Sequence, residues 1–132
     1  MAPVRTYGLS HIALKVRDPG ASFAFYESVL VMVSVYRGDD FIQAQTPGSR
    51  DVLVLELGEK DAGQHGGIAH FGFRLLDPAD ISEAIAAVEG AGGLILSHGE
   101  FVPGEPYVFF TDIDGYEVEI WYELPTPIDP SR

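Results

Sequence analysis

The feature that most constrains the fold is a ten-residue pattern that occurs twice. Residues 10–19 read SHIALKVRDP, and residues 69–78 read AHFGFRLLDP. In both, a histidine is followed by six residues and then by Asp-Pro, with apolar and other residues alternating after the histidine. Alternation with a period of two is typical of a half-buried strand, and Asp-Pro is a typical start of a helix. The chain is therefore predicted to contain the same strand–helix unit twice.

The segments that follow each copy also match in order. The first helix is expected over 18–30, with Asp18 as its N-cap and Pro19 at the first helical position, and the second over 77–92. Three short strand patterns follow each helix, so each half reads β-α-β-β-β. We expect one domain over 1–132, with module one at about 8–58, a linker at 58–67, module two at about 68–123 and an extended tail at 124–132.

Composition narrows the class of partner. The 132-residue chain has a formal net charge of −12, no cysteine and 46% hydrophobic residues. Nucleic acid and anionic membranes are not expected partners, because binding them needs clustered Lys and Arg. Without cysteine, disulfides and thiolate–metal sites are excluded. The N-terminal segment lacks the apolar run of a signal peptide, and no stretch approaches the roughly 20 apolar residues of a membrane span. We therefore expect a cytoplasmic protein.

The repeated histidines and the glutamates of the last strands are the candidate functional residues. His11 and His70 lie on strand faces opposite the apolar residues that should pack on the helices. Two modules related by a rough two-fold axis would place both histidines across a shared cavity. The last strand of each half adds a carboxylate, Glu56 in the first half and Glu117 or Glu119 in the second. Imidazoles and carboxylates together suit Fe, Mn, Ni, Co or Zn, so the residues predict a divalent-metal site.

The chain resembles the vicinal oxygen chelate superfamily, which groups glyoxalase I, fosfomycin-resistance and bleomycin-resistance proteins, and extradiol dioxygenases. The matching stretches, LSHIALKVRD, GGIAHFGFRL and DIDGYEVEIWYE, lie within residues 8–123. The resemblance implies an α+β fold in which two paired βαβββ modules form an incomplete barrel around a metal-binding cavity. It also implies that His11, His70 and Glu119 are metal ligands. Glu56 matches the glyoxalase I position that serves as a fourth ligand or a base.

The resemblance implies an enzyme, and three functions stay open. We favour a glyoxalase I-like lyase or isomerase, in which a divalent metal ion chelates vicinal oxygens of a small organic substrate and Glu56 or Glu119 moves a proton. The alternative is an Fe(II) extradiol-type dioxygenase that uses His11, His70 and Glu119. The second alternative is a metal-free drug-binding resistance protein, against which the intact ligand set counts. A homodimer is expected, since exposed module edges usually find a partner in this family.

Two further residues have open roles. Arg74 shares the His70 face of its strand, where it could pair with a substrate carboxylate or with Glu117. His98 is a candidate acid–base group for the dioxygenase, although a loop position without a catalytic role is the preferred interpretation. Aromatic residues on the cavity face could shape an apolar pocket, while most of the aromatic residues are expected in the core.

Overall fold

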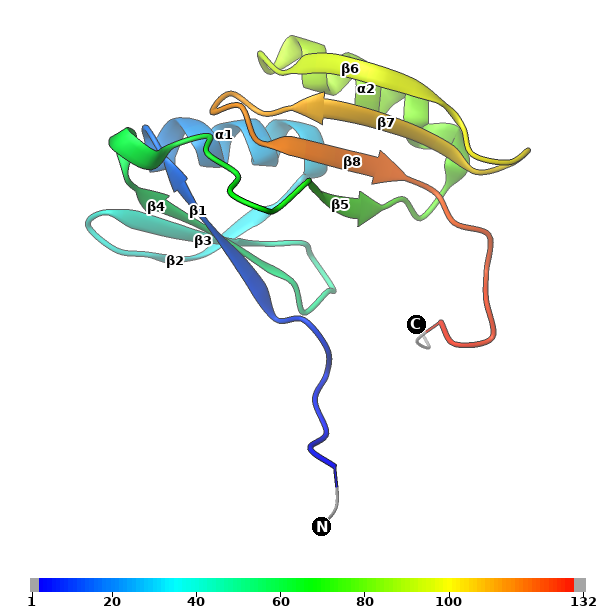
Figure 1. Ribbon diagram of the computed structural model, residues 1–132, viewed down its shortest axis with the longest axis horizontal. Helices are drawn as coiled ribbons and strands as arrows, with labels where there is room; N and C mark the ends of the chain where they lie inside the picture. Colours follow the sequence, from blue (N-terminus) through cyan, green and yellow to red (C-terminus); the bar gives the residue numbers. More distant parts are fainter. Residues whose placement is uncertain (1–2, 130–132) are drawn as a thin grey trace. The chain divides into compact units, whose positions relative to one another are not determined.

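The structure, a computed structural model, describes residues 3–129. The chain divides into two compact units, unit 1 (Met1–Gly63) and unit 2 (Gln64–Arg132). Within the described residues, each unit contains one four-stranded sheet and one α-helix. The helix of each unit packs on its own sheet (Figure 1). The opposite face of each sheet is left for the polar and aromatic side chains that form the candidate site.

In unit 1, the first and the last strand of the chain segment are neighbours in the sheet. Its elements are β1 (His11–Val16), α1 (Pro19–Leu30), β2 (Val33–Arg37), β3 (Phe41–Gln45), β4 (Val52–Leu57) and the short 3-10 helix η1 (Glu59–Asp61). The sheet order is β1-β4-β3-β2. β1 and β4 pair in parallel, and the other neighbours are antiparallel. The last strand of the unit therefore lies beside the first, which brings two distant segments onto one face.

Local sequence explains where α1 begins and ends. One carboxylate oxygen of Asp18 accepts hydrogen bonds from the backbone N–H groups of Gly20, at 3.0 Å, and Ala21, at 3.3 Å. Pro19 needs no such partner, because it has no N–H to satisfy. The helix ends at Val31, which has a left-handed φ of 50°. The predicted cap and the predicted helix over 18–30 are confirmed.

The core of unit 1 lies between α1 and the sheet. Phe23 and Tyr26 of the helix are buried, and so are Val16, Leu53 and Leu55 of the two paired strands. Because successive side chains of a strand point to opposite faces, residues between these apolar ones face away from the helix. The period-two pattern of the sequence thus assigns β1 its buried and its open face correctly.

Unit 2 has the same order of elements. They are β5 (Phe71–Arg74), η2 (Pro78–Asp80), α2 (Ile81–Gly90), β6 (Leu94–Glu100), β7 (Pro106–Thr111) and β8 (Glu117–Trp121). The sheet order, β5-β8-β7-β6, corresponds to that of unit 1, including the parallel pair formed by the first and last strands. Val88 of α2 is fully buried, as are Val108, Val118 and Ile120 of the sheet, so the core again lies under the helix.

The predicted α+β fold with two β-α-β-β-β modules is confirmed, with differences in detail. The second helix, expected over 77–92, starts with the 3-10 turn η2, in which the Asp77 carboxylate accepts the N–H of Ala79 at 2.9 Å. His98, interpreted as a loop residue, lies inside β6 instead. Among residues 3–129, no strand of one sheet pairs with a strand of the other sheet. No helix in that range is long and apolar enough to cross a membrane.

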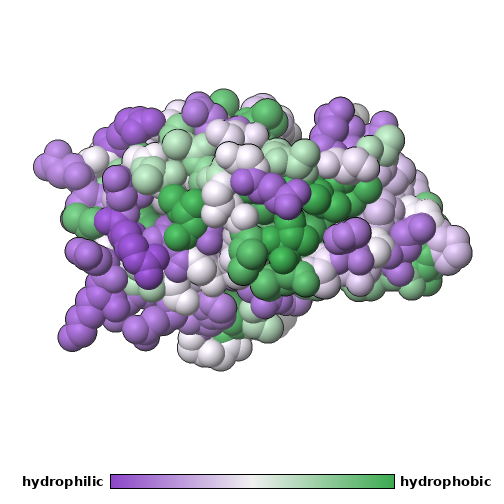
Figure 2. All heavy atoms as spheres, turned by 90° about the horizontal axis from the view of Figure 1, so that it is seen from above, coloured by the Kyte–Doolittle hydropathy of each residue, from purple (hydrophilic) through white to green (hydrophobic). Residues whose placement is uncertain are grey.

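The edge strands β2 and β6, one in each sheet, expose apolar side chains. Val33 and Val35 of β2 are 45% and 48% exposed, and Leu94 and Leu96 of β6 are 64% and 47% exposed. Figure 2 shows hydrophobic residues, in green, exposed among hydrophilic ones on the surface. Exposed edge strands offer unpaired backbone groups to another chain, and apolar side chains on them favour such contacts.

Candidate functional site

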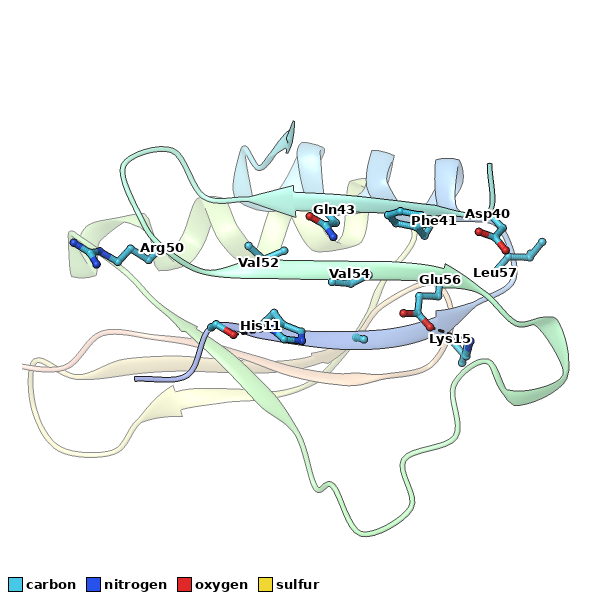
Figure 3. A pocket seen from close by; sticks show the side chains of 12 residues that line it. His11, Lys15, Asp40, Phe41, Gln43, Arg50, Val52, Val54, Glu56 and Leu57 are labelled. Atoms are coloured by element: carbon cyan, nitrogen blue, oxygen red, sulfur yellow. Dashed lines mark hydrogen bonds and ion pairs between the residues drawn. The ribbon is translucent and has the colours of Figure 1, made fainter. Parts of the chain in front are cut away.

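The open face of the unit 1 sheet is hollowed into a pocket of about 630 Å³. Its walls come from β1, β3 and β4 and from the loop before β4 (Figure 3). Figure 3 shows His11 and Arg50 toward one end and a contact between Lys15 and Glu56 toward the other. Val54 lies between these two ends. The pocket therefore combines a histidine, both signs of charge and an apolar floor, as small-molecule sites commonly do.

His11 stands at the start of β1 on the pocket face. The Oγ of the preceding residue, Ser10, lies 2.7 Å from His11 Nδ1. A hydrogen bond to one ring nitrogen fixes the orientation of the ring and selects the other nitrogen as a ligand. In the tautomer in which Nδ1–H donates to Ser10, the Nε2 lone pair of His11 is available to an ion, and the exposed ring is accessible from the pocket.

Glu56 is held by Lys15. The two residues are register partners on the parallel strands β1 and β4, and Lys15 Nζ lies 2.9 Å from Glu56 Oε1. The hydrogen bond and the negative charge of Glu56 raise the pKa of Lys15 above its ordinary value. Gly58 makes room for this arrangement, since a Cβ there would lie 2.6 Å from Lys15 Cδ. The pair thus fixes a carboxylate at one end of the pocket.

In unit 2, a tight turn leads into the strand that carries Glu119. The buried Asp112 accepts three backbone hydrogen bonds on Oδ1, from Asp114 at 2.9 Å and from Gly115 and Tyr116 at 3.0 Å each. Gly115 has a φ of 101°, a conformation that side-chain-bearing residues rarely adopt. These four residues belong to the DIDGYEVE stretch of the sequence, and their turn sets where β8 begins.

His70 and Glu119, two of the candidate ligands, lie close together in unit 2. His70 Nε2 lies 3.6 Å from Glu119 Oε1, with the Glu119 side chain only 13% exposed. Burial raises the pKa of the Glu119 carboxyl, while the neighbouring His70 opposes that rise. Gly72, the register partner of Glu119, leaves space beside it, because a Cβ there would lie 3.3 Å from Glu119 Cβ. The strand sequence therefore opens room for this carboxylate.

The His70–Glu119 pair fits a divalent metal ion. Protein ligands lie about 2.0–2.2 Å from such an ion, so two of them are within about 4 Å of each other. The observed separation of 3.6 Å meets that condition. Among residues 3–129, no three His, Asp or Glu side chains gather closely enough to hold an ion. His11 belongs to the other unit, so the set of His11, His70 and Glu119 stays a prediction.

Glu56 and Glu119 are not at matching positions in their sheets. In the strand ladders, Glu119 lies opposite the second residue after the repeated histidine, whereas Glu56 lies opposite the fourth. The unit 1 residue at the level of Glu119 is Val54. Four residues of strand span roughly 13 Å, far more than the separation of two ligands of one ion. Glu56 is therefore poorly placed to share an ion with His11, and its position suits a role elsewhere in the pocket.

Aromatic rings extend the face of unit 2 that carries His70. The His70 ring lies edge-on to Phe109, with 5.1 Å between centroids, and Phe109 contacts Tyr107 at 5.6 Å. Tyr107 stacks on Phe101 at 4.1 Å, and Phe101 lies 6.2 Å from Trp121. They form a continuous apolar surface beside the pair of candidate ligands.

Sequence reasoning missed two ionic contacts of the site. Lys15 could have been found, since alternation along β1 puts it on the His11 face, but its pairing with Glu56 depends on the register of β4. Arg74 was expected to pair with a substrate or with Glu117, whereas it contacts Asp129 of the tail at 2.8 Å. No local pattern in the sequence signals that contact, because 55 residues separate its partners.

Comparison with known proteins defines the family. The chain matches the model of the Glyoxalase/Bleomycin resistance protein/Dioxygenase superfamily over residues 8–120. An uncharacterised protein of Pseudomonas aeruginosa is 30% identical over 127 residues, which cover 89% of either chain.

Solved structures share the fold at lower identity. The fosfomycin resistance protein FosX of Listeria monocytogenes, in complex with Mn(II) and a sulfate ion, is 21% identical, with 91% of this chain and 93% of that chain covered and a TM-score of 0.75. A glyoxylase/bleomycin resistance protein/dioxygenase domain from Frankia sp. EAN1pec is 24% identical, with 91% and 100% covered and a TM-score of 0.73. The family model spans most of the chain, from before β1 into β8. The chain belongs to the Glyoxalase/Bleomycin resistance protein/Dioxygenase superfamily.

Proposed function

We propose that the protein is a divalent-metal-dependent enzyme that acts on a small organic molecule with two neighbouring oxygen atoms. The ligands in this proposal are His11, His70 and Glu119. The observation that carries it is the 3.6 Å separation of His70 Nε2 and Glu119 Oε1, which suits two ligands of one ion. The Mn(II) complex of FosX, a protein of the same fold, supports a divalent ion.

In this proposal, residues around the pocket have separate roles. Ser10 holds Nδ1 of His11 and leaves Nε2 for the ion. Glu56 lines the same pocket as His11 and accepts a proton from the bound molecule, while Lys15 keeps the carboxylate in place. A bound divalent ion supplies Lewis-acid polarisation of the substrate oxygens.

Within this class we favour a lyase or isomerase reaction of the glyoxalase I type. Such a reaction needs a metal ion and a base, and Glu56 offers a carboxylate inside a pocket large enough for a small molecule. One observation favours a second candidate, an Fe(II) extradiol-type dioxygenase that acts on an aromatic molecule. The contact of His70 with Phe109 begins a row of rings on which an aromatic substrate would lie. A metal-free drug-binding protein would leave the histidines and glutamates without a role.

We also propose that the protein is a homodimer. The support is the exposure of apolar side chains on one edge strand of each sheet, Val35 at 48% on β2 and Leu96 at 47% on β6. A sheet edge of this kind is stabilised when a second copy covers it.

The metal content of protein purified without added metal tests the proposal. We expect about one divalent ion per chain in the wild type, and its loss in His11→Ala, His70→Ala and Glu119→Gln. Glu117→Gln is the matched control, because Glu117 lies on the same strand and the same face as Glu119 and should leave the ion in place. Wild-type protein without any divalent ion would overturn the proposal and favour the drug-binding alternative.

Glu56→Gln separates the two reactions. If Glu56 is a base and not a ligand, this variant keeps the metal ion but loses the lyase or isomerase activity. Loss of the ion instead would make Glu56 a fourth ligand, as in the glyoxalase I-like arrangement. Cleavage of a catechol by the Fe(II)-loaded variant would favour the dioxygenase.

A further inference from the structure

Arg74 is the residue of the unit 2 sheet that holds Asp129 of the tail, while Leu124 at the start of the tail donates its N–H to Glu105 Oε2 at 3.0 Å. Arg74, at the end of β5, donates from Nη1 to Asp129 Oδ1 at 2.8 Å and from Nη2 to Asp129 Oδ2 at 2.9 Å. Arg74 Nη2 also donates to the backbone oxygen of Glu123 at 3.2 Å. Two parallel hydrogen bonds between a guanidinium and a carboxylate are the arrangement by which arginine recognises carboxylates in general.

The tail presents Asp129 to Arg74 in a preformed turn. The Asp129 carboxylate accepts the backbone N–H and the hydroxyl of Thr126, each at 3.0 Å. These contacts and the guanidinium hold the pKa of Asp129 well below its ordinary value. The contact is nevertheless open to solvent, since the side chains of Arg74 and Asp129 are 35% and 26% exposed. An ion pair of this exposure contributes little to stability, so it exchanges readily with another carboxylate.

The position of Arg74 on the sheet is what suggests a ligand. Arg74 lies four residues beyond His70 on the same face of the strand, roughly 13 Å along it. Its register partner on β8 is Trp121, which belongs to the row of aromatic rings that starts beside His70. A guanidinium is charged at every physiological pH and here stands at the end of an apolar aromatic surface. Such a surface with a cation at its end suits a molecule that has an aromatic part and an anionic group.

We propose that Arg74 is the binding position for the carboxylate of an aromatic small molecule, and that Asp129 occupies this position as a built-in competitor. The tail then acts as a strap that such a ligand displaces. The inference rests on the proposed function in one respect, the sheet face on which the ligand binds. Arg74 and Trp121 lie on the same face as the proposed metal ligands His70 and Glu119. Binding at Arg74 needs no metal ion, so the two proposals can fail separately.

Trp121 gives a direct measurement, because it is the only tryptophan of the chain. The probe is 3-phenylpropionate, and its neutral amide, 3-phenylpropionamide, is the matched ligand without the charge. Titration of Trp121 fluorescence gives the dissociation constant of each. Asp129→Asn keeps the shape of the tail and removes the closer of the two carboxylates at Arg74, since Glu123 Oε2 stays 3.4 Å from Nη1. In this variant we expect the carboxylate ligand to bind about two- to fivefold tighter, the size of effect that an exposed ion pair gives. The amide should bind equally in both proteins.

Variants of Arg74 test the other side of the contact. Arg74→Gln should weaken binding of the carboxylate and leave binding of the amide unchanged. Arg74→Lys should weaken it less, because lysine keeps the positive charge but lacks the two parallel N–H donors of the guanidinium. Asp80→Asn is the control for net charge, since Asp80 is an exposed aspartate of the same unit and makes the same change of one charge.

Three outcomes would overturn the inference. Equal tightening in Asp129→Asn and Asp80→Asn would mean that only the overall charge matters. Equal effects on the carboxylate and the amide would mean that Arg74 does not recognise the anion. Absence of binding by the carboxylate to Asp129→Asn would mean that Arg74 serves only to fasten the tail. Metal content, measured on the same samples, reports on the proposed function independently.

Discussion

Asp112 and Gly115 form the centre of the turn that leads into the strand of Glu119. The Gly115 N–H donates to Asp112 Oδ1 at 3.0 Å, and Gly115 adopts a φ of 101°. Because the turn fixes where β8 begins, it fixes the step of the ladder at which Glu119 faces Gly72. A change at Gly115 therefore tests how strongly the backbone supports the candidate ligand.

Replacing Gly115 with alanine should destabilise the protein. No atom lies within 4 Å of where the new Cβ would be, so the cost comes from backbone strain alone, at least about 1 kcal/mol of the free energy of unfolding. The measurement is urea unfolding of the variant beside Gly67→Ala. Gly67 has the same open surroundings without a positive φ, so its replacement should be neutral or slightly stabilising. Equal losses in both variants would contradict the explanation.

Replacing Gly58 with alanine should separate Lys15 from Glu56. The new Cβ would lie 2.6 Å from Cδ and 3.0 Å from Cβ of Lys15, so the lysine stem has to move. The pKa of Lys15, raised by Glu56, should then fall toward its ordinary value of 10.5, as followed by NMR titration of the lysine side chain.

The sign of this pH effect follows from the direction of the shift. A lysine whose folded pKa is raised stabilises the fold at all pH values below its unfolded pKa, and the contribution is lost as the pH rises through the folded pKa. Wild type and Gly58→Ala should therefore differ least at strongly alkaline pH. A Lys15 titration that is the same in Gly58→Ala and in wild type would show that the pair survives the substitution.

The contact between the tail and Arg74 should persist across the neutral and mildly acidic range. The pKa of Asp129 is lowered in the folded protein, so the contact is complete above the ordinary aspartate pKa near 3.9 and is lost as the pH falls through the lower, folded value. The backbone N–H of Thr126, which donates to Asp129, is the NMR reporter. Its titration midpoint is expected below pH 3.9, and a midpoint at or above that value would mean that the contact does not form in solution.

The proposed homodimer predicts a particle of twice the 14.3 kDa chain mass in light scattering after size-exclusion chromatography. Leu96→Glu, which places a charge on the exposed edge strand β6, should shift the population toward monomer. Glu89→Gln, at a helical surface position of the same unit, should leave the mass unchanged. A wild-type monomer at all concentrations would disprove the dimer.

Much of the fold could be predicted from the sequence because its signals are local. The alternation after His11 assigned β1 its two faces, and the Asp-Pro pairs located both helix starts to within a few residues. The exception is the 3-10 turn η2, since Asp-Pro favours a helical start without choosing between a 3-10 and an α-helical turn.

The candidate site could be predicted only in part, because ladder position is not local. The intervals from His11 to Glu56 and from His70 to Glu119 are similar in residues, yet the two glutamates lie at different steps of their ladders. Turn and loop lengths between the strands differ in the two halves, so a count along the chain does not give the level reached on the sheet. The contact of Arg74 with the tail is non-local in the same way.

The fourth residue after each repeated histidine is a cation, Lys15 in unit 1 and Arg74 in unit 2, and each faces the last strand of its own sheet. In unit 1 the register partner on that strand is Glu56, but in unit 2 the register partner is Trp121. Because β8 has no carboxylate at this position, Arg74 contacts the carboxylate of Asp129 in the tail instead. Asp129 of the tail thus has the role in unit 2 that Glu56, a residue of the sheet, has in unit 1. Among related chains, we expect an acidic residue at the position of Trp121 to go together with a tail that lacks this aspartate.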